Sequence, residues 1–158
     1  MKYGLIGEKL GHSFSKPIHE KIADYNYEIK EISKENLDSF MRAKEFVGIN
    51  VTIPYKEDVI PYLDSIDEAA KAIGAVNTII NREGKLYGYN TDFYGMRALI
   101  KREKIEVNDK KVLILGSGGT SKTALWVAKD LGAKEIIRVS RTKKEGFTTY
   151  DEISNCYD

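Results

Sequence analysis

Residues 111–121 combine a strand pattern with a glycine turn. The apolar run Lys111–Leu115 predicts a buried strand that leads directly into the glycine-rich segment Gly116–Ser121. A helix is predicted from Thr120 to Leu131, with Gly132 as its C-cap, and a second strand over Glu135–Val139. Strand, helix and strand in this order predict a βαβ unit with parallel strands.

The preceding residues alternate between strand-like and helix-like segments, which predicts an α/β sandwich with a mostly parallel sheet. Strands are predicted at Lys2–Ile6, Tyr27–Ile32, Phe46–Val51, Val76–Asn81 and Lys85–Tyr89, the last two joined by a turn at Arg82–Lys85. Helices are predicted at Pro17–Ala23, Lys34–Ala43 with Ser33 as N-cap, Lys56–Leu63, Asp67–Ile73 and Phe93–Arg102.

A polar, turn-rich segment at Ile105–Lys110 separates these two regions. It predicts a first domain over residues 1–104 and a second over residues 105–158. A doubly wound nucleotide-binding domain has about six strands, whereas only about two precede Asp158. The second domain is therefore expected to be an incomplete Rossmann-type domain, and the chain alone is expected to lack turnover.

Composition excludes several kinds of partner. The 25 Lys and Arg residues nearly balance the 24 Asp and Glu residues, which disfavours nucleic acid or an anionic membrane as the main partner. No apolar stretch approaches the roughly 20 residues of a membrane-spanning helix. The lone Cys156 predicts a reducing, cytoplasmic location. His12 and His19 have no third ligand nearby, so no metal site is predicted.

The glycine segment fits a dinucleotide fingerprint, in which glycines allow a tight turn and a close approach of backbone to pyrophosphate. The helix N-terminus that follows favours phosphate. The spacing from Gly116 to Lys122 also nearly matches a nucleotide-binding P-loop, and that alternative stays open. Arg141 and its neighbours follow the second strand, where a basic residue accommodates the 2′-phosphate of NADP and an acid would favour NAD. The sequence therefore favours NADP, although a solvated basic turn also explains Arg141.

Polar side chains follow several predicted strands of the first domain. Ser13 and Ser15 come after the first strand, where two hydroxyls suit a small anion such as a carboxylate. Ser15 also suits the cap of the next helix. Thr52 and Lys56 flank Pro54, and a lysine held in a cleft suits acid–base work, although Lys56 also suits a solvent-exposed position.

Two further polar residues complete the set. Asn77 stands at a strand start, and Asp92 precedes a predicted helix. Helix capping is the alternative interpretation of Asp92. A chargeable pair, Lys56 and Asp92, upstream of a dinucleotide turn indicates proton transfer coupled to hydride transfer.

Five runs, in order, resemble the shikimate dehydrogenase family over nearly the whole chain. They are Ser13–Ser15 with His19, Asn50–Lys56, Gly74–Thr78, Asn90–Gly95 and Gly116–Ser121. The resemblance implies a cytoplasmic, NADP-dependent oxidoreductase that reversibly reduces 3-dehydroshikimate to shikimate in aromatic amino-acid biosynthesis.

The resemblance also implies site residues. Ser13 and Ser15 would hold the substrate carboxylate, and Thr52, Lys56, Asn77 and Asp92 would contact the ring hydroxyls. Lys56 and Asp92 would form the catalytic pair. The cofactor residues would be Gly116, Ser117, Gly118, Gly119, Thr120, Ser121, Ser140, Arg141 and Thr142.

The chain departs from the family pattern in two places that bear on function. Ser140 stands where an Asn commonly precedes the Arg, and family members continue well past Asp158. Two alternatives therefore stay open: an NAD-using quinate/shikimate dehydrogenase and a non-catalytic shikimate-binding fragment. The sequence leaves a homodimer open as well.

Overall fold

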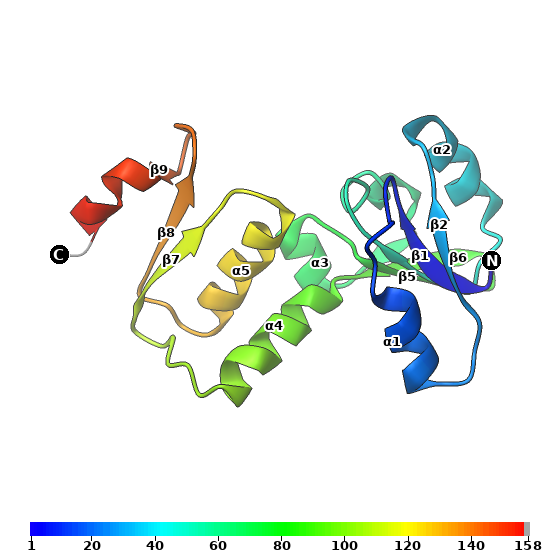
Figure 1. The fold of residues 1–158 in the computed structure, drawn as a ribbon, viewed down its shortest axis with the longest axis horizontal. Coiled ribbons are helices and arrows are strands. Elements are labelled where there is room, and N and C mark those ends of the chain that lie inside the picture. The colour runs from blue at the N-terminus through cyan, green and yellow to red at the C-terminus, as the bar shows by residue number, and fades with distance from the viewer. Residues whose placement is uncertain (157–158) are drawn as a thin grey trace. The chain divides into compact units, whose positions relative to one another are not determined.

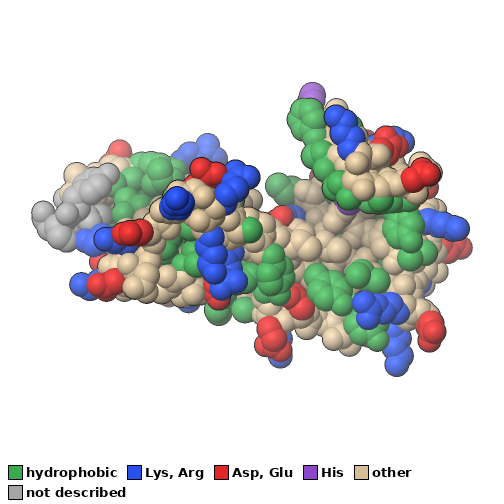
Figure 2. Space-filling model, turned by 90° about the horizontal axis from the view of Figure 1, so that it is seen from below, with side chains coloured by type: hydrophobic (Ala, Val, Ile, Leu, Met, Phe, Trp, Pro, Cys, Tyr) green, Lys and Arg blue, Asp and Glu red, His purple; other side chains and the backbone are tan. Residues whose placement is uncertain are grey.

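The chain divides into two compact units, Met1–Thr91 and Asp92–Asp158, in a computed structural model that describes residues 1–156 (Figure 1). The sequence placed its boundary near residue 105, so the helix between the two positions falls in the second unit. No helix in the described part of the chain is long and apolar enough to cross a membrane. Acidic and basic side chains are interspersed on the face drawn in Figure 2.

The first unit is a mixed, mostly parallel sheet with helices. Its elements are β1 (Tyr3–Gly7), α1 (Ser15–Ile22), β2 (Tyr27–Glu31), α2 (Lys34–Ala43), β3 (Gly48–Val51), the 3-10 helix η1 (Ile60–Tyr62), β4 (Ser65–Ile66), α3 (Glu68–Ile73), β5 (Thr78–Arg82) and β6 (Lys85–Tyr89). The strand order is β2-β1-β3-β5-β6-β4. β1 is parallel to β2 and β3, and β4 is parallel to β6, whereas β5 is antiparallel to both of its neighbours. The predicted fold class is confirmed.

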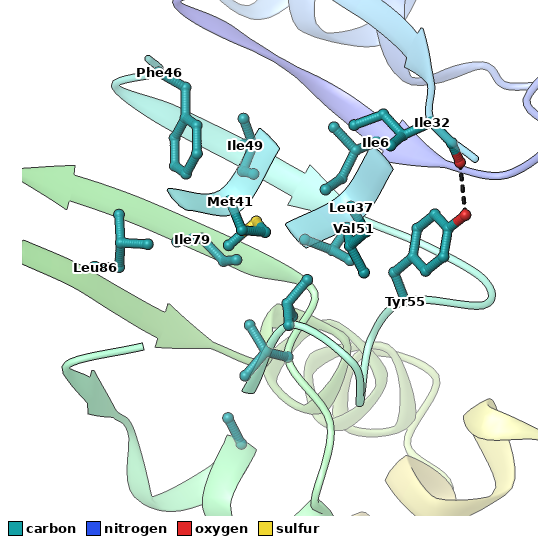
Figure 3. Close-up of a cluster of buried hydrophobic side chains, with 13 residues drawn as sticks. Ile6, Ile32, Leu37, Met41, Phe46, Ile49, Val51, Tyr55, Ile79 and Leu86 are labelled. Carbon is teal, nitrogen blue, oxygen red and sulfur yellow. Dashed lines mark hydrogen bonds between the residues drawn. The ribbon is translucent and has the colours of Figure 1, made fainter. Parts of the chain in front are cut away.

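The pleat of β3 separates two environments. Successive side chains of a strand point to opposite faces, so Ile49 and Val51 enter one apolar core while Asn50 faces the other side. Leu37 and Met41 of α2 cover this core (Figure 3). The other buried members are Ile6, Ile32, Phe46, Tyr55, Val59, Ala70, Val76, Ile79 and Leu86.

The opposite face of the sheet carries a much smaller apolar cluster. Leu5 and Leu10 pack there with Tyr27, the first residue of β2. His19 of α1 stacks on the Tyr27 ring with 3.9 Å between the ring centroids. Because Leu5 and Ile6 point to opposite faces, α1 and α2 cover opposite sides of the sheet (Figure 1).

The predicted helix over Lys56–Leu63 is wrong. Residues 53–59 form turns, and only the short η1 follows them. Tyr55 and Val59 both have no exposed surface, so their helix-like spacing reflects two anchors of an irregular segment. The Ile53–Pro54 peptide bond is cis. The two-residue strand β4 was also not predicted, because so short a run has no detectable hydrophobic periodicity.

The second unit contains α4 (Thr91–Arg102, counting the last residue of the first unit), β7 (Lys111–Leu115), α5 (Gly119–Asp130), β8 (Glu135–Ser140), β9 (Thr148–Thr149) and the 3-10 helix η2 (Tyr150–Cys156). β7, β8 and β9 form a parallel sheet in that order, which confirms the predicted βαβ unit. The short third strand was not predicted. The C-cap of α5 is Leu131, one residue before the predicted cap Gly132, which follows it with a positive φ of 78°.

The close pairing of β1 with β2 requires that position 4 has no side chain. A Cβ at this position would lie 2.3 Å from the backbone oxygen of Glu28, which cannot move without disturbing the sheet. We expect Gly4→Ala to lower the free energy of unfolding by about 2 kcal/mol or more. Gly11→Ala is the matched control, since a Cβ there meets nothing within 4 Å. Urea titration followed by circular dichroism measures both, and equal midpoints would contradict the expectation.

Candidate functional site

One edge of the first sheet collects the polar residues. β1 and β3 are parallel and end at this edge, β5 runs the opposite way and begins there, and β6 ends there. The segments that follow β1 and β3 carry Ser13 and Thr52, and Asn77 immediately precedes β5. Ligand sites of α/β sheets lie outside the carboxyl ends of the strands, so the topology predicts a ligand site here.

The segment after β1 presents two hydroxyl groups. The amide of Ser13 donates to the carbonyl of Leu10 at 2.9 Å, and the amide of Ser15 donates to Oγ of Ser13 at 3.2 Å. α1 begins at Ser15, and its N-cap position, Phe14, makes no side-chain capping bond. The alternative that Ser15 caps this helix is therefore wrong, because Ser15 is the first residue of the helix.

Gly7 lets the β1 and β3 segments approach each other. A Cβ on Gly7 would lie 2.8 Å from Cγ2 of Thr52 and 2.8 Å from Cδ2 of Leu10. The amide of Thr52 donates to the carbonyl of Ile6 at 2.9 Å, which fixes this approach. The absence of a side chain at Gly7 thus brings the serine segment and the threonine–lysine segment to one place.

Lys56 is half-buried in a turn that is anchored on both sides. The preceding Tyr55 is fully buried, and its phenol donates to the carbonyl of Ile32 at 2.6 Å (Figure 3). The carbonyl of Lys56 itself accepts from the amide of Val76 at 2.8 Å. Burial raises the pKa of the Tyr55 phenol, so this anchor stays protonated near neutral pH. Lys56 therefore occupies a defined position and not the first turn of a helix.

Asn77 is a buried hub of hydrogen bonds. Its Oδ1 accepts from the Thr91 amide at 2.9 Å, from Oγ1 of Thr91 at 3.2 Å and from Oγ1 of Thr78 at 3.1 Å. Three protein donors thus converge on the amide oxygen, and the donor end, Nδ2, is the end suited to a ligand.

Asp92 directly follows Thr91 in the chain and is the first residue of the second unit. It lies in the first turn of α4, inside the helix and not at the N-cap that the alternative interpretation expected. A carboxylate in this turn is favoured by the helix dipole.

Tyr27, Asn50 and Thr78 form a polar row that the sequence did not single out as part of the site. The Tyr27 phenol donates to Oδ1 of Asn50 at 2.7 Å, and Nδ2 of Asn50 donates to Oγ1 of Thr78 at 3.1 Å. Burial raises the pKa of the Tyr27 phenol to about 12; Tyr25 adds to the rise and a hydrogen bond from Ser15 opposes it. One feature of the sequence could have indicated this row. Asn50 lies between two core residues of β3, so its side chain must point to the opposite face of the sheet.

The predicted cofactor residues gather at one edge of the second sheet. Parallel strands β7 and β8 end together, so the glycine segment comes to the same edge as Ser140, Arg141 and Thr142. The amide of Gly116 donates to the carbonyl of Val139 at 2.9 Å. The Ser140 hydroxyl donates to the carbonyl of Thr142, which folds this turn back on itself.

The glycine turn fits a phosphate group. Gly116 has a φ of 122°, which favours glycine, and a Cβ on Gly116, Gly118 or Gly119 would meet nothing within 4 Å. α5 begins here without a side-chain capping bond, and the N-terminus of a helix favours an anion such as phosphate. Beside it lies a pocket of about 230 Å³, lined by Ser117, Ser121, Lys122, Arg138, Lys144 and Phe147. Lys144 bridges the two loops by donating to Oγ of Ser117 at 3.1 Å.

No group of three or more His, Cys, Asp or Glu side chains within residues 1–156 is placed to hold a metal ion. His19 instead makes a hydrogen bond between its Nδ1 and the hydroxyl of Tyr25. His19 is thus occupied by the aromatic cluster on the second face of the sheet.

The fold and the two edges define an α/β ligand-binding unit followed by a Rossmann-type βαβ unit. Residues 5–79 match the family described as the shikimate dehydrogenase substrate binding domain. The NADP(+) shikimate dehydrogenase of Clostridium beijerinckii is 43% identical over 169 residues, covering 96% of this chain and 63% of that protein.

Solved structures agree. The crystal structure of shikimate dehydrogenase 1 from Peptoclostridium difficile has a TM-score of 0.85 and 41% identity, over 97% of this chain and 63% of that one. The Thermus thermophilus enzyme, in complex with NADP(H) and shikimate, has a TM-score of 0.80 and 29% identity over 90% and 56% of the two chains. The chain thus spans less than two thirds of the length of these relatives. Over nearly its whole length the chain is similar to the corresponding part of shikimate dehydrogenases.

The raised pKa of Tyr27 predicts a loss of stability in alkali. In the unfolded chain the phenol titrates near 10.0, whereas in the folded chain it titrates at about 12. The contribution of the Tyr27 phenol to the free energy of unfolding is therefore intact below pH 10 and is lost as the pH rises toward 12. Between these values the wild type should lose on the order of 2 kcal/mol more stability than Tyr27→Phe. Urea titrations across this range measure the difference, and parallel curves would contradict it.

Proposed function

We propose that this chain supplies the substrate site and the first part of the cofactor site of an NADP-dependent shikimate dehydrogenase. The reaction is the reversible reduction of 3-dehydroshikimate to shikimate. The observation that carries the proposal is the convergence of Ser13, Ser15, Thr52, Lys56 and Asn77 at one edge of the first sheet. Hydroxyl, amide and ammonium groups gathered there suit a ligand with one carboxylate and several hydroxyls.

In this proposal Ser13 and Ser15 donate hydrogen bonds to the substrate carboxylate. Thr52 and Asn77 contact the ring hydroxyls, the latter through Nδ2, because its Oδ1 already accepts from Thr78 and Thr91. A neutral set of donors at the serine end binds the anion through short, charge-assisted hydrogen bonds. The substrate is thereby oriented with its carboxylate away from Lys56.

Lys56 and Asp92 are the proposed catalytic pair. Bound NADPH supplies the hydride that is added to the carbonyl carbon. The Lys56 ammonium gives a proton to the carbonyl oxygen, which becomes the new hydroxyl, and takes it back in the reverse direction. The Asp92 carboxylate is proposed to orient this ammonium and to stabilise its charge.

The second unit is proposed to hold the dinucleotide. The backbone from Gly116 to Ser121 would receive the pyrophosphate at the start of α5. Arg141, with Ser140 and Thr142 beside it, would meet the adenosine 2′-phosphate, and that phosphate distinguishes NADP from NAD. A relative that is described in complex with NADP(H) and shikimate supports NADP as the cofactor.

Two alternative functions can be distinguished from this proposal by measurement. A quinate/shikimate dehydrogenase that uses NAD would bind NAD⁺ more tightly than NADP⁺ and accept quinate. A non-catalytic shikimate-binding protein would bind shikimate without turnover. Titrations with both acids and both cofactors therefore sort the three functions.

Ser13→Ala should weaken shikimate binding. A hydrogen bond to a charged group contributes about 1.5–3 kcal/mol, so the dissociation constant should rise by about 10-fold or more. Calorimetric titration of the chain with shikimate measures this. The matched control is Ser39→Ala, because the exposed hydroxyl of Ser39 donates to the carbonyl of Asn36 in α2 and lies outside the site. Equal losses in both variants would count against the serine assignment.

Lys56→Met should abolish turnover while leaving the fold intact. Proton transfer by a positioned group typically contributes at least about 100-fold to the rate, so kcat should fall by that factor or more. NADPH oxidation in the presence of 3-dehydroshikimate measures the rate. Lys71→Met is the control, since Lys71 is an exposed lysine of α3. A near-normal rate in Lys56→Met would remove Lys56 from the catalytic pair.

A further inference from the structure

The phenol of Tyr27 forms one end of the polar row on the second face of the sheet. Tyr27 is 2% exposed, and its ring stacks on His19 at 3.9 Å with 12° between the planes. A phenylalanine would satisfy that stacking equally well. The buried hydroxyl, which costs free energy unless it is hydrogen-bonded, therefore points to a role of its own.

The Tyr27 side chain links two elements beside the proposed substrate site. Its hydroxyl donates to Oδ1 of Asn50 in β3 at 2.7 Å. Its ring stacks on His19 of α1. Tyr27 thus bridges α1 and the middle of the sheet across β1.

Both ends of the Asn50 amide are fixed by these contacts. Its oxygen accepts from Tyr27, and its Nδ2 donates to Oγ1 of Thr78 at 3.1 Å and to the carbonyl of Asn77 at 3.4 Å. An amide held at the oxygen by an O–H donor cannot turn over without losing bonds at both ends. Thr78 in turn donates to Oδ1 of Asn77 at 3.1 Å. The orientation of Asn50 therefore affects the hydrogen bonds at Oδ1 of Asn77 through Thr78.

We propose that Tyr27 is a positioning residue that, through Asn50, sets the orientation of the hydrogen-bonding groups in the proposed shikimate site. This inference rests on the proposed function for its ligand and on the described contacts for its geometry. Tyr27 acts without touching the substrate, because its side chain is buried and its hydroxyl donates to Asn50.

Removal of the hydroxyl tests this role. Tyr27→Phe keeps the ring and its stacking and should raise the dissociation constant for shikimate by about 10-fold, the value of one well-placed buried hydrogen bond. Tyr25→Phe is the matched control, because it removes a phenol from the same aromatic cluster that bonds to His19. Its effect should stay below about 2-fold. Equal effects in the two variants would overturn the proposal.

A double-mutant cycle separates positioning from general loosening of the fold. If Tyr27 acts through Asn50, then Tyr27→Phe should change affinity by less than about 2-fold in an Asn50→Ala background. Additive losses would show that Tyr27 acts by another route, and would overturn the proposal. Circular dichroism and thermal melting confirm that each variant is folded.

A second readout needs no shikimate. In the wild-type chain the side-chain amide protons of Asn50 should give two resolved NMR signals that Tyr27→Phe shifts and Tyr25→Phe leaves in place. Unchanged Asn50 signals in Tyr27→Phe would overturn the positioning role. Failure of the wild type to bind shikimate would instead reject the proposed function for this chain while the NMR result still decides the role of Tyr27.

The wild-type chain supplies a test if Tyr27→Phe does not fold. A buried phenol that donates to Asn50 should show a hydroxyl proton protected from exchange with water, with a nuclear Overhauser effect to the Asn50 side chain. A hydroxyl proton without that effect would overturn the proposal.

Discussion

The alternation of side chains along β3 sets most of what this molecule can do. Ile49 and Val51 point into the larger apolar core, and Asn50, between them, points to the opposite face. A shift of pairing by one residue would put the amide in the core and two branched apolar side chains among the polar groups. The hydrophobic effect therefore fixes the register of β3, and the register in turn places Asn50 opposite Thr78.

The antiparallel β5 completes this arrangement. In an all-parallel sheet the segment before a strand lies at the edge opposite the ligand site. Because β5 runs against β3 and β6, Asn77 comes to the edge where β1, β3 and β6 end. The hub at Oδ1 of Asn77 then ties the start of β5 to Thr91, next to Asp92. A reversal of one strand thus gathers groups from four segments around one place.

The rigid parts of the site are held by groups that do not contact a ligand in the proposal. Tyr55 and Val59 bury the turn that carries Lys56, and Gly7 permits the approach of the segments after β1 and β3. A lysine on a flexible stem has several rotamers, and a fixed backbone limits the region its ammonium can reach. The proposed substrate-side residues are therefore placed mainly by packing, whereas the glycine turn of the second unit is placed by backbone geometry.

The sequence by itself determined the order and type of the long elements, because their apolar residues follow a helical or strand period. It also indicated the segments that carry Ser13, Lys56, Asn77 and Asp92, which form local patterns beside predicted strands. It failed over Lys56–Leu63, where the buried pair Tyr55 and Val59 imitates helical spacing.

Only the tertiary structure decided which of these segments meet and what lies between them. The strand order and the direction of β5 depend on pairings between residues far apart in the chain, which no local pattern records. The Tyr27–Asn50 hydrogen bond joins residues 23 positions apart. The local spacing of apolar residues around either one does not predict this contact. Local periodicity is encoded in neighbouring residues, whereas the polar row exists only because distant strands share one face of a sheet.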